Sequence, residues 1–168
     1  SLDLTVRLPE GGHSSMPPQE TAIGLLSEAI LRLEENPFPA KVDGATAGLL
    51  RHAGPEMNLP FRMLFANLWL TEPLLIKVLT GDPAAAATVR TTTAPTMLRA
   101  GVKDNVLPTQ ATATVNFRIL PGETVTSVAG YVRRTIDDER VEVNITDSLN
   151  AQNPSPVSET GAFGFRVI

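Results

Sequence analysis

The chain opens with a strict alternation of apolar and polar side chains. Leucine or valine stands at every second position of residues 2–8, with polar residues between them. A period of two is typical of a strand that buries one face. The same alternation recurs in residues 111–119 and 141–145. The pattern therefore predicts three half-buried strands.

Two other segments repeat their apolar residues with the spacing of an α-helix. In residues 19–35 the apolar side chains form one stripe, and Asn36-Pro37 ends the segment. Pro17 and Pro18 fit only in or before the first turn, because proline lacks the N–H that a helix interior needs. Residues 125–136 show the same spacing. We predict an amphipathic helix in each segment.

The remaining segments are less regular. Residues 88–98 are rich in threonine and typical of a strand, and Pro95 within them predicts a bulge or a sheet edge. Residues 99–108 are expected to form a turn. Residues 38–55 read as a loop, and residues 59–70 and 71–79 as two short helices.

The order of these elements predicts an α+β fold of the ferredoxin-like, split β-α-β kind. We expect a four-stranded antiparallel sheet with two helices on one face. A helical insertion, at about residues 37–87, would lie between the first helix and the second strand. We expect residues 1–149 to form this domain and residues 150–168 to be a linker to a domain absent from this sequence, so that the chain is a piece of a longer protein.

Composition narrows the function classes. The chain has 168 residues, of which 42% are hydrophobic and 19% charged, as in ordinary globular proteins. A net charge of −4 and an aromatic content of 5% argue against a nucleic-acid partner, because phosphate binding needs clustered Lys and Arg. No apolar run reaches the roughly 18 residues of a membrane span. Nothing in the sequence favours one compartment.

The sequence predicts no metal site and no complete active site. It has no cysteine, and its two histidines, His13 and His52, are far apart. A di-zinc site needs about five or six His, Asp or Glu ligands. We expect His52 to be a loop residue without a role, and the aromatic and methionine residues of the insertion to pack against one another or to form a wall facing a lipophilic substrate or a partner.

Three segments are candidates for chemistry. His13 lies in GGHSSMPP (residues 11–18), between a flexible diglycine and a helix, where it is either an exposed hydrogen-bond donor or part of the helix cap. Asn105 lies in VKDNVLP (residues 102–108), which by itself reads as a connecting turn. Arg118, in NFRILPG (residues 116–122), falls on the polar face of its strand, where it either binds a carboxylate or is solvated.

Taken together, these segments resemble the lid-domain signatures of the aminoacylase, carboxypeptidase S and succinyl-diaminopimelate desuccinylase group of di-zinc metallopeptidases. The resemblance spans nearly the whole chain and is greatest to the carboxypeptidase S branch, whose lid carries a helical insertion. Ala100-Gly101 is a small departure from the pattern of this group, because relatives commonly have a diglycine there.

The resemblance implies a dimerisation and substrate-capping lid of a zinc-dependent peptidase or N-acyl-amino-acid amidohydrolase, not catalytic alone. Two lids would pair as a homodimer, each supplying His13, Asn105 and Arg118 to the active site of the partner subunit. By this resemblance His13 stabilises the oxyanion, Asn105 contacts the substrate and Arg118 holds its carboxylate. Two zinc ions would lie in the absent catalytic domain. The alternative is a stand-alone ferredoxin-like regulatory module that binds a small ligand.

Overall fold

A computed structural model describes residues 1–149, 151–159 and 161–167. The chain divides into two compact units. Unit 1 consists of Ser1–Phe38, Thr92–Arg118 and Thr124–Asn153, and unit 2 of Pro39–Thr91, Ile119–Glu123 and Pro154–Ile168.

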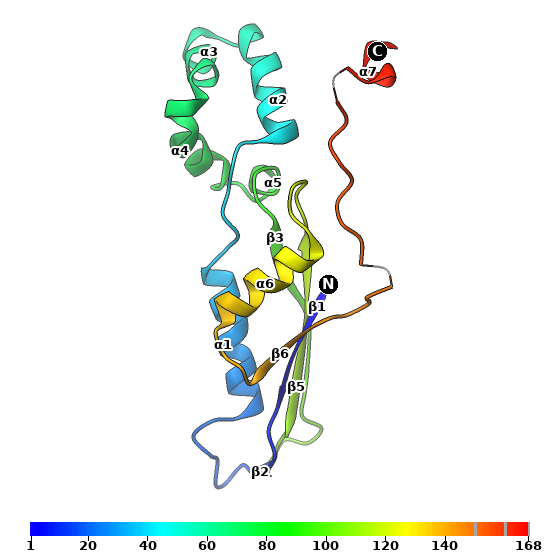
Figure 1. The fold of residues 1–168 in the computed structure, drawn as a ribbon. Helices are drawn as coiled ribbons and strands as arrows, with labels where there is room; N and C mark the ends of the chain where they lie inside the picture. Colours follow the sequence, from blue (N-terminus) through cyan, green and yellow to red (C-terminus); the bar gives the residue numbers. More distant parts are fainter. Residues whose placement is uncertain (150, 160, 168) are drawn as a thin grey trace. The chain divides into compact units, whose positions relative to one another are not determined.

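A four-stranded antiparallel sheet is the centre of unit 1. Its strands lie in the order β3-β5-β1-β6, so that β1 and β5 are central and β3 and β6 are edges. Helices α1 and α6 both lie on one face of this sheet (Figure 1). This is the predicted split β-α-β topology, and the α+β fold class is confirmed. The elements are β1 (Leu2–Arg7), α1 (Ala22–Glu35), β3 (Thr92–Ala100), β5 (Gln110–Arg118), α6 (Val125–Ile136) and β6 (Val141–Ile145).

The core of unit 1 lies between the sheet and the two helices. The alternating apolar residues of the strands point toward the helices, because successive side chains in a strand face opposite sides. Phe38 closes one end of this core, with its ring centroid 4.1 Å from that of Tyr131 and 6.1 Å from that of Phe117. The buried residues include Leu2, Leu4, Val6, Leu25, Leu26, Leu33, Val115, Val128, Val132 and Ile136.

The opposite face of the sheet is polar. Thr114 Oγ1 donates a hydrogen bond to Asp3 Oδ1 (2.7 Å), and Arg7 forms an ion pair with Glu142. These contacts join side chains of neighbouring strands across the face that carries no helix. The polar positions of the alternation, which include the exposed Arg118, therefore line the face of the sheet that carries no helix.

Edge strand β3 is interrupted at Pro95. Its register against β5 shifts between Pro95 and Met97. Proline has no N–H for the ladder, so it is tolerated only at an edge or a bulge. Both expectations for Pro95 are met, although the strand spans residues 92–100 rather than 88–98. Residues 88–91 belong to unit 2, where Val89 and Thr91 are buried.

Unit 2 contains the helical insertion. Its helices are α2 (Gly44–Ala53), the 3₁₀ helix η1 (Gly54–Glu56), α3 (Leu59–Ala66), α4 (Leu68–Leu79) and α5 (Pro83–Ala86), and α7 (Phe163–Val167) lies in the tail. The prediction of a loop at residues 38–55 is wrong for its second half, because residues 44–53 form helix α2. His52 is consequently a helix residue, with Nδ1 2.8 Å from the Gly48 carbonyl oxygen.

The break between α3 and α4 also differs from expectation. It lies at Asn67, which ends α3 and begins α4, rather than near Leu70. The Asn67 side-chain amide donates to the Met63 carbonyl (2.9 Å), and Thr71 Oγ1 donates to the Leu64 carbonyl (2.7 Å). These bonds satisfy carbonyls at the end of α3 that the helix itself leaves open. Pro73 therefore lies inside α4 and not at its start.

Candidate functional site

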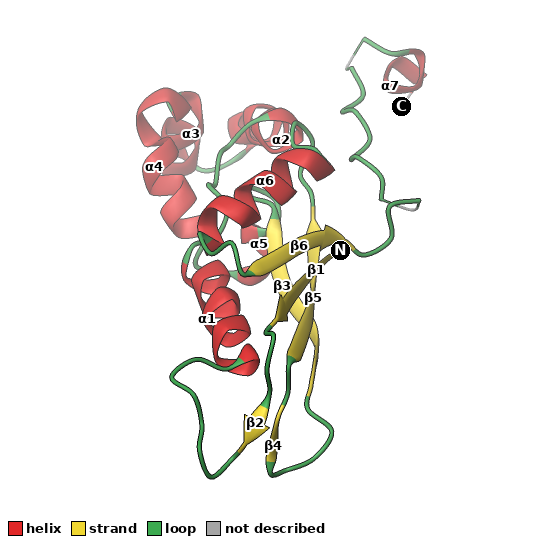
Figure 2. Ribbon diagram, turned by 60° about the horizontal axis from the view of Figure 1, so that its bottom comes forward, coloured by secondary structure: helices red, strands yellow, loops and turns green. Residues whose placement is uncertain are grey.

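The tip of unit 1 is built by two short strands that the sequence pattern did not predict. Strands β2 (Gly12–His13) and β4 (Val106–Leu107) pair antiparallel, with His13 opposite Val106 (Figure 2). Gly11 allows this approach, because a Cβ there would lie 2.7 Å from the Leu107 carbonyl oxygen. Two-residue strands are too short to show an alternation, so a sequence pattern cannot reveal them.

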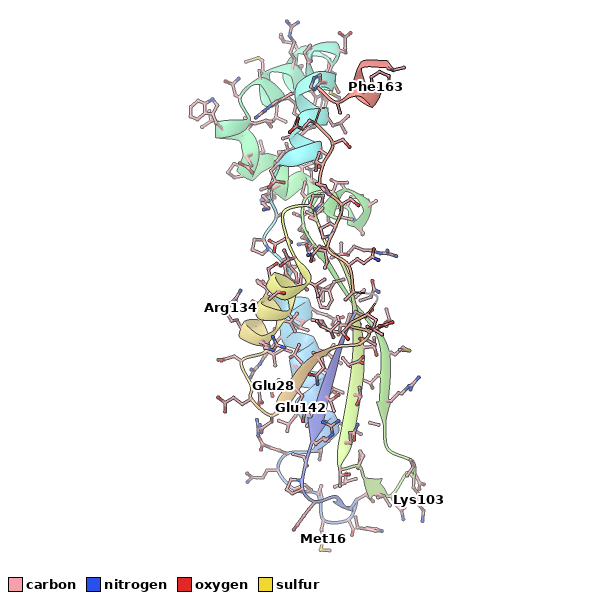
Figure 3. The ribbon with its side chains drawn as sticks, turned by 45° about the vertical axis from the view of Figure 1, so that its right-hand side comes forward. Met16, Glu28, Lys103, Arg134, Glu142 and Phe163 are labelled. Carbon is pink, nitrogen blue, oxygen red and sulfur yellow. The ribbon has the colours of Figure 1, made fainter. Side chains whose placement is uncertain are left out.

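The tip brings His13 and Asn105 together. The Ser14 N–H donates to the Asn105 carbonyl (3.1 Å), and the Asn105 Nδ2 lies 3.5 Å from His13 Nε2. The two residues stand 92 positions apart in sequence. Figure 3 shows the neighbouring Met16 and Lys103 at the same end of unit 1. Two of the three predicted site residues therefore form one local pair.

The tautomer of His13 follows from Ser15. The Ser15 backbone N–H donates to His13 Nδ1 (3.2 Å), and Ser15 Oγ lies 2.9 Å from the same atom. A ring nitrogen that accepts a hydrogen bond carries no proton, so a neutral His13 carries its proton on Nε2. From the sequence, no contact was assigned to Ser15. Its position two residues after the histidine is the signal for this contact.

With this tautomer, the tip presents the Nε2–H donor of His13 beside the side-chain amide of Asn105. Asn105 Oδ1 is buried without a hydrogen-bond partner among the described residues. With the amide turned so that Oδ1 faces the ring, Asn105 accepts a hydrogen bond from His13 Nε2–H. An N–H donor at this place can bond an oxygen that gains negative charge. The arrangement is chemically suited to polarising a carbonyl group.

Arg118 lies at the other end of the sheet. It is the last residue of β5 and pairs with Thr92, whereas the tip lies beyond Gln110 at the first residue of β5. With about 3.4 Å per residue, the eight steps from Gln110 to Arg118 span about 27 Å. The Arg118 side chain is exposed and has no ion pair or hydrogen bond with the described residues. The structure thus separates Arg118 from His13 and Asn105.

The shifted titrating groups lie away from these residues. Hydrogen bonds from the Arg140 side chain and backbone lower the pKa of Asp138 to about 2, and the same contact, with a second from Glu20, raises the pKa of Arg140. These groups connect the turn before β6 to the segment before α1. We assign them a structural role.

Neither a metal cluster nor a membrane span is found in the described part of the chain. Residues 1–149, 151–159 and 161–167 contain no group of three or more His, Cys, Asp or Glu side chains placed to hold a metal ion. Within the same residues, no helix has the length and apolar character needed to cross a membrane. The described residues do not fit a zinc ion.

The chain is similar in sequence to a known protein family and to several curated proteins. Residues 10–144 match the family described as peptidase dimerisation domain. An N-fatty-acyl-amino acid synthase/hydrolase of Xenopus tropicalis is 46% identical over 171 residues, covering 100% of this chain and 32% of the relative. A probable carboxypeptidase S-like protein of Dictyostelium discoideum is 44% identical over 158 residues, covering 94% of this chain and 30% of the relative.

More distant similarities extend to two yeast proteins. Carboxypeptidase S of Saccharomyces cerevisiae is 32% identical over 105 residues, covering 57% of this chain and 18% of the relative. The solved structure of the di-peptidase Dug1p from the same organism has a TM-score of 0.49 and 12% identity, and covers 98% of this chain and 37% of that chain. The chain spans about a third of the length of the first two curated relatives.

Proposed function

The chain belongs to the peptidase dimerisation domain family, and we propose that it is the dimerisation and substrate-capping lid of a zinc-dependent peptidase or N-acyl-amino-acid amidohydrolase. The lid comprises residues 1–149, and residues 150–168 link it to a catalytic domain. Residues 150, 160 and 168 of that linker lie outside the described residues. The observation that carries the proposal is the contact between His13 and Asn105 at the tip, in which the Ser15 N–H leaves the His13 proton on Nε2.

His13 acts at the scissile carbonyl of the substrate. Its Nε2–H donates to the carbonyl oxygen, and this bond strengthens as the oxygen gains charge in the transition state. Asn105 holds the substrate beside His13 with its amide. The Ser15 N–H keeps the imidazole in the donor tautomer throughout. An N-acyl amino acid or a peptide is the substrate class, supported by the names of the Xenopus tropicalis and Dictyostelium discoideum relatives.

Arg118 binds the free carboxylate of the substrate with its unpaired guanidinium. In an N-acyl amino acid the carboxylate is one carbon away from the amide nitrogen, so Arg118 and His13 must act within a few ångströms of each other. About 27 Å of strand separates them within one copy. The resemblance implies that all three residues serve the partner subunit's active site. We infer instead that each active site takes His13 and Asn105 from one copy and Arg118 from the other.

The second copy pairs through edge strand β3. Its N–H and C=O groups on the side away from β5 have no neighbouring strand in the sheet, and such edges readily pair with another chain. The Met97 and Leu98 side chains of this strand are about half exposed. A two-fold pair extends the sheet across both copies. Self-association through this edge would give the active site its two sources of residues.

The zinc ions of the parent enzyme would be held by its catalytic domain, because the described residues here offer no cluster for them. Such a metal would lower the pKa of a bound water and so supply the nucleophile. The lid residues contribute hydrogen bonds and charge. The lid by itself is therefore expected to hydrolyse nothing.

Kinetics of full-length variants test the proposal. His13→Ala should lower kcat by about a hundredfold or more, because the lost donor acts in the transition state. Arg118→Ala should mainly raise KM for substrates with a free carboxylate, because that contact exists in the ground state too. Neither should change the melting temperature of the lid much. If both variants melt far below the wild type, the two residues are structural and the proposal fails.

Mixing the two variants tests the division between copies, at a substrate concentration far below the KM of Arg118→Ala, where each variant alone has little activity. In a dimer of one His13→Ala and one Arg118→Ala subunit, one active site receives both intact residues and the other receives neither. Random exchange of subunits should therefore restore about a quarter of the wild-type activity. If a single copy supplied all three residues to one site, mixing would restore nothing. Recovery after mixing two batches of the same variant is the control.

A further inference from the structure

Unit 2 carries an open groove between its short helices. Figure 1 shows α2, α3 and α4 gathered together in the insertion. The groove has a volume of about 480 Å³, which lies within the range of small-molecule sites. It is lined by Leu50 and Arg51 of α2, Gly54 and Pro55 of η1, Arg62, Phe65 and Ala66 of α3, and Leu68 and Trp69 of α4.

The inner surface of this groove is apolar. Phe65 is 9% exposed and is flanked in the lining by leucine side chains from α2 and α4. Gly54 allows η1 to approach this ring, because a Cβ there would lie 3.2 Å from Phe65 Cβ. Trp69 is 81% exposed, although a side chain of this size usually buries most of its surface. A hydrocarbon chain in the groove would therefore contact the buried ring of Phe65 and the exposed ring of Trp69.

The charge of the lining has one sign. Arg51 and Arg62 are its only ionisable side chains, and the lining contains no carboxylate. Neither guanidinium has an ion pair or a hydrogen bond with the described residues. Two unpaired guanidinium groups beside an apolar surface are complementary to an anion with an apolar body.

We propose that this groove binds a single-chain amphiphile with an anionic head group. The hydrocarbon tail lies along Leu50, Phe65 and Leu68 and is covered by Trp69. The carboxylate or other anionic head accepts hydrogen bonds from Arg51 and Arg62. The occupant is one soluble molecule, because a groove of this size encloses one chain rather than a membrane surface. This proposal goes beyond the lid function and does not depend on it.

Trp69 fluorescence tests the proposal directly, because it is the only tryptophan of the chain. The whole chain is titrated with dodecanoate below its critical micelle concentration. Covering the indole should shift its emission to shorter wavelength in a saturable way. Butanoate, which has the head without the tail, and dodecyltrimethylammonium, which has the tail with a cation, should each bind at least about tenfold more weakly.

Variants separate the roles of charge and shape. The double variant Arg51→Gln/Arg62→Gln should bind dodecanoate about tenfold or more weakly, because charge-assisted hydrogen bonds are lost. Ala66→Phe should abolish binding by filling the groove. Arg134→Gln on α6 removes an exposed arginine of unit 1 and should change nothing (Figure 3). Circular dichroism checks folding, and if Ala66→Phe does not fold, the arginine variant decides.

Several outcomes would overturn the proposal. Equal affinity for the cationic amphiphile would show that the arginines do not select the head group. A shift of Trp69 with phosphatidylglycerol vesicles but not with dodecanoate would identify a membrane surface as the partner. No shift with any probe would show that the groove holds no amphiphile. Unchanged binding by the arginine double variant would place the head group elsewhere.

Discussion

The two units of the chain bury their apolar residues to very different extents. Of the nine largest fully buried side chains, eight belong to unit 1 and only Val89 belongs to unit 2. The helices of unit 2 instead leave large apolar side chains in contact with solvent, among them Leu49, Phe61, Met63, Trp69, Leu70, Leu74 and Val78. A sheet face covered by two helices closes a core, whereas the short helices of unit 2 leave much of their apolar surface uncovered. Unit 1 should therefore determine stability, and the exposed apolar surface of unit 2 is available for binding.

The largest effect should come from removing a core side chain of unit 1. Leu26 is 1% exposed, so Leu26→Ala should reduce the free energy of unfolding by about 2–5 kcal/mol through lost burial and an internal cavity. The matched change Leu70→Ala in unit 2 should cost within about 0.5 kcal/mol, because that side chain is 65% exposed. Denaturant unfolding followed by circular dichroism measures both. Equal losses would contradict the comparison.

A smaller effect is expected at the tip of unit 1. Gly11→Ala should cost about 1–3 kcal/mol and separate β2 from β4, because its Cβ would meet a backbone oxygen rather than a flexible side chain. The Ser14 amide, which donates to Asn105, should then exchange its hydrogen faster. Hydrogen exchange followed by NMR measures this loss. Unchanged protection of Ser14 would show that the close approach at Gly11 does not hold the site together.

The same type of substitution should have the opposite sign in unit 2. A Cβ on Gly48 of α2 would have no atom within 4 Å, so Gly48→Ala meets no obstacle. It should stabilise unit 2 by about 0.5–1 kcal/mol, because alanine favours a helix interior more than glycine does. Thermal unfolding followed by Trp69 fluorescence measures the gain. A loss of stability would mean that α2 packs more tightly than its exposed side chains suggest.

The smallest effect concerns an exposed ion pair of unit 1. Because the pKa of Asp138 is lowered to about 2, this carboxylate stabilises the fold above its unfolded pKa near 4. The contribution is lost as the pH falls from about 4 through about 2. Asp138→Asn should cost less than about 1 kcal/mol at neutral pH, since solvent screens the pair. Its difference from wild type should vanish near pH 2. A pH-independent difference in unfolding free energy would assign the effect to packing instead.

The sequence predicted the elements of unit 1 better than those of unit 2 for a physical reason. In unit 1 each strand and helix buries one face, so the period of its apolar residues shows its conformation. The helix at Val125–Ile136 and the strand at Val141–Ile145 match their predicted bounds. In unit 2, helix α2 is made largely of glycine and alanine, which show little apolar period, and it was taken for a loop.

The candidate site was found through resemblance more than through chemistry. The family assignment made on the three motifs is confirmed by the match over residues 10–144. His13 and Asn105 are 92 positions apart, so no local pattern could show that they meet. The distance of Arg118 from His13 and Asn105 depends on which end of strand β5 lies next to the tip. That direction is a property of the antiparallel topology and not of the residue itself.

The two edge strands of the sheet, β3 and β6, differ in how readily another copy could pair with them. The bulge at Pro95 bends edge strand β3, so a second copy can match it only over a limited register. The opposite edge, β6, is five residues long and carries Glu142, which is held by Arg7. Short, charged edges discourage further pairing. If two copies join through β3 as proposed, neither offers an equivalent edge to a third, and growth would stop at a closed pair instead of continuing as a fibre.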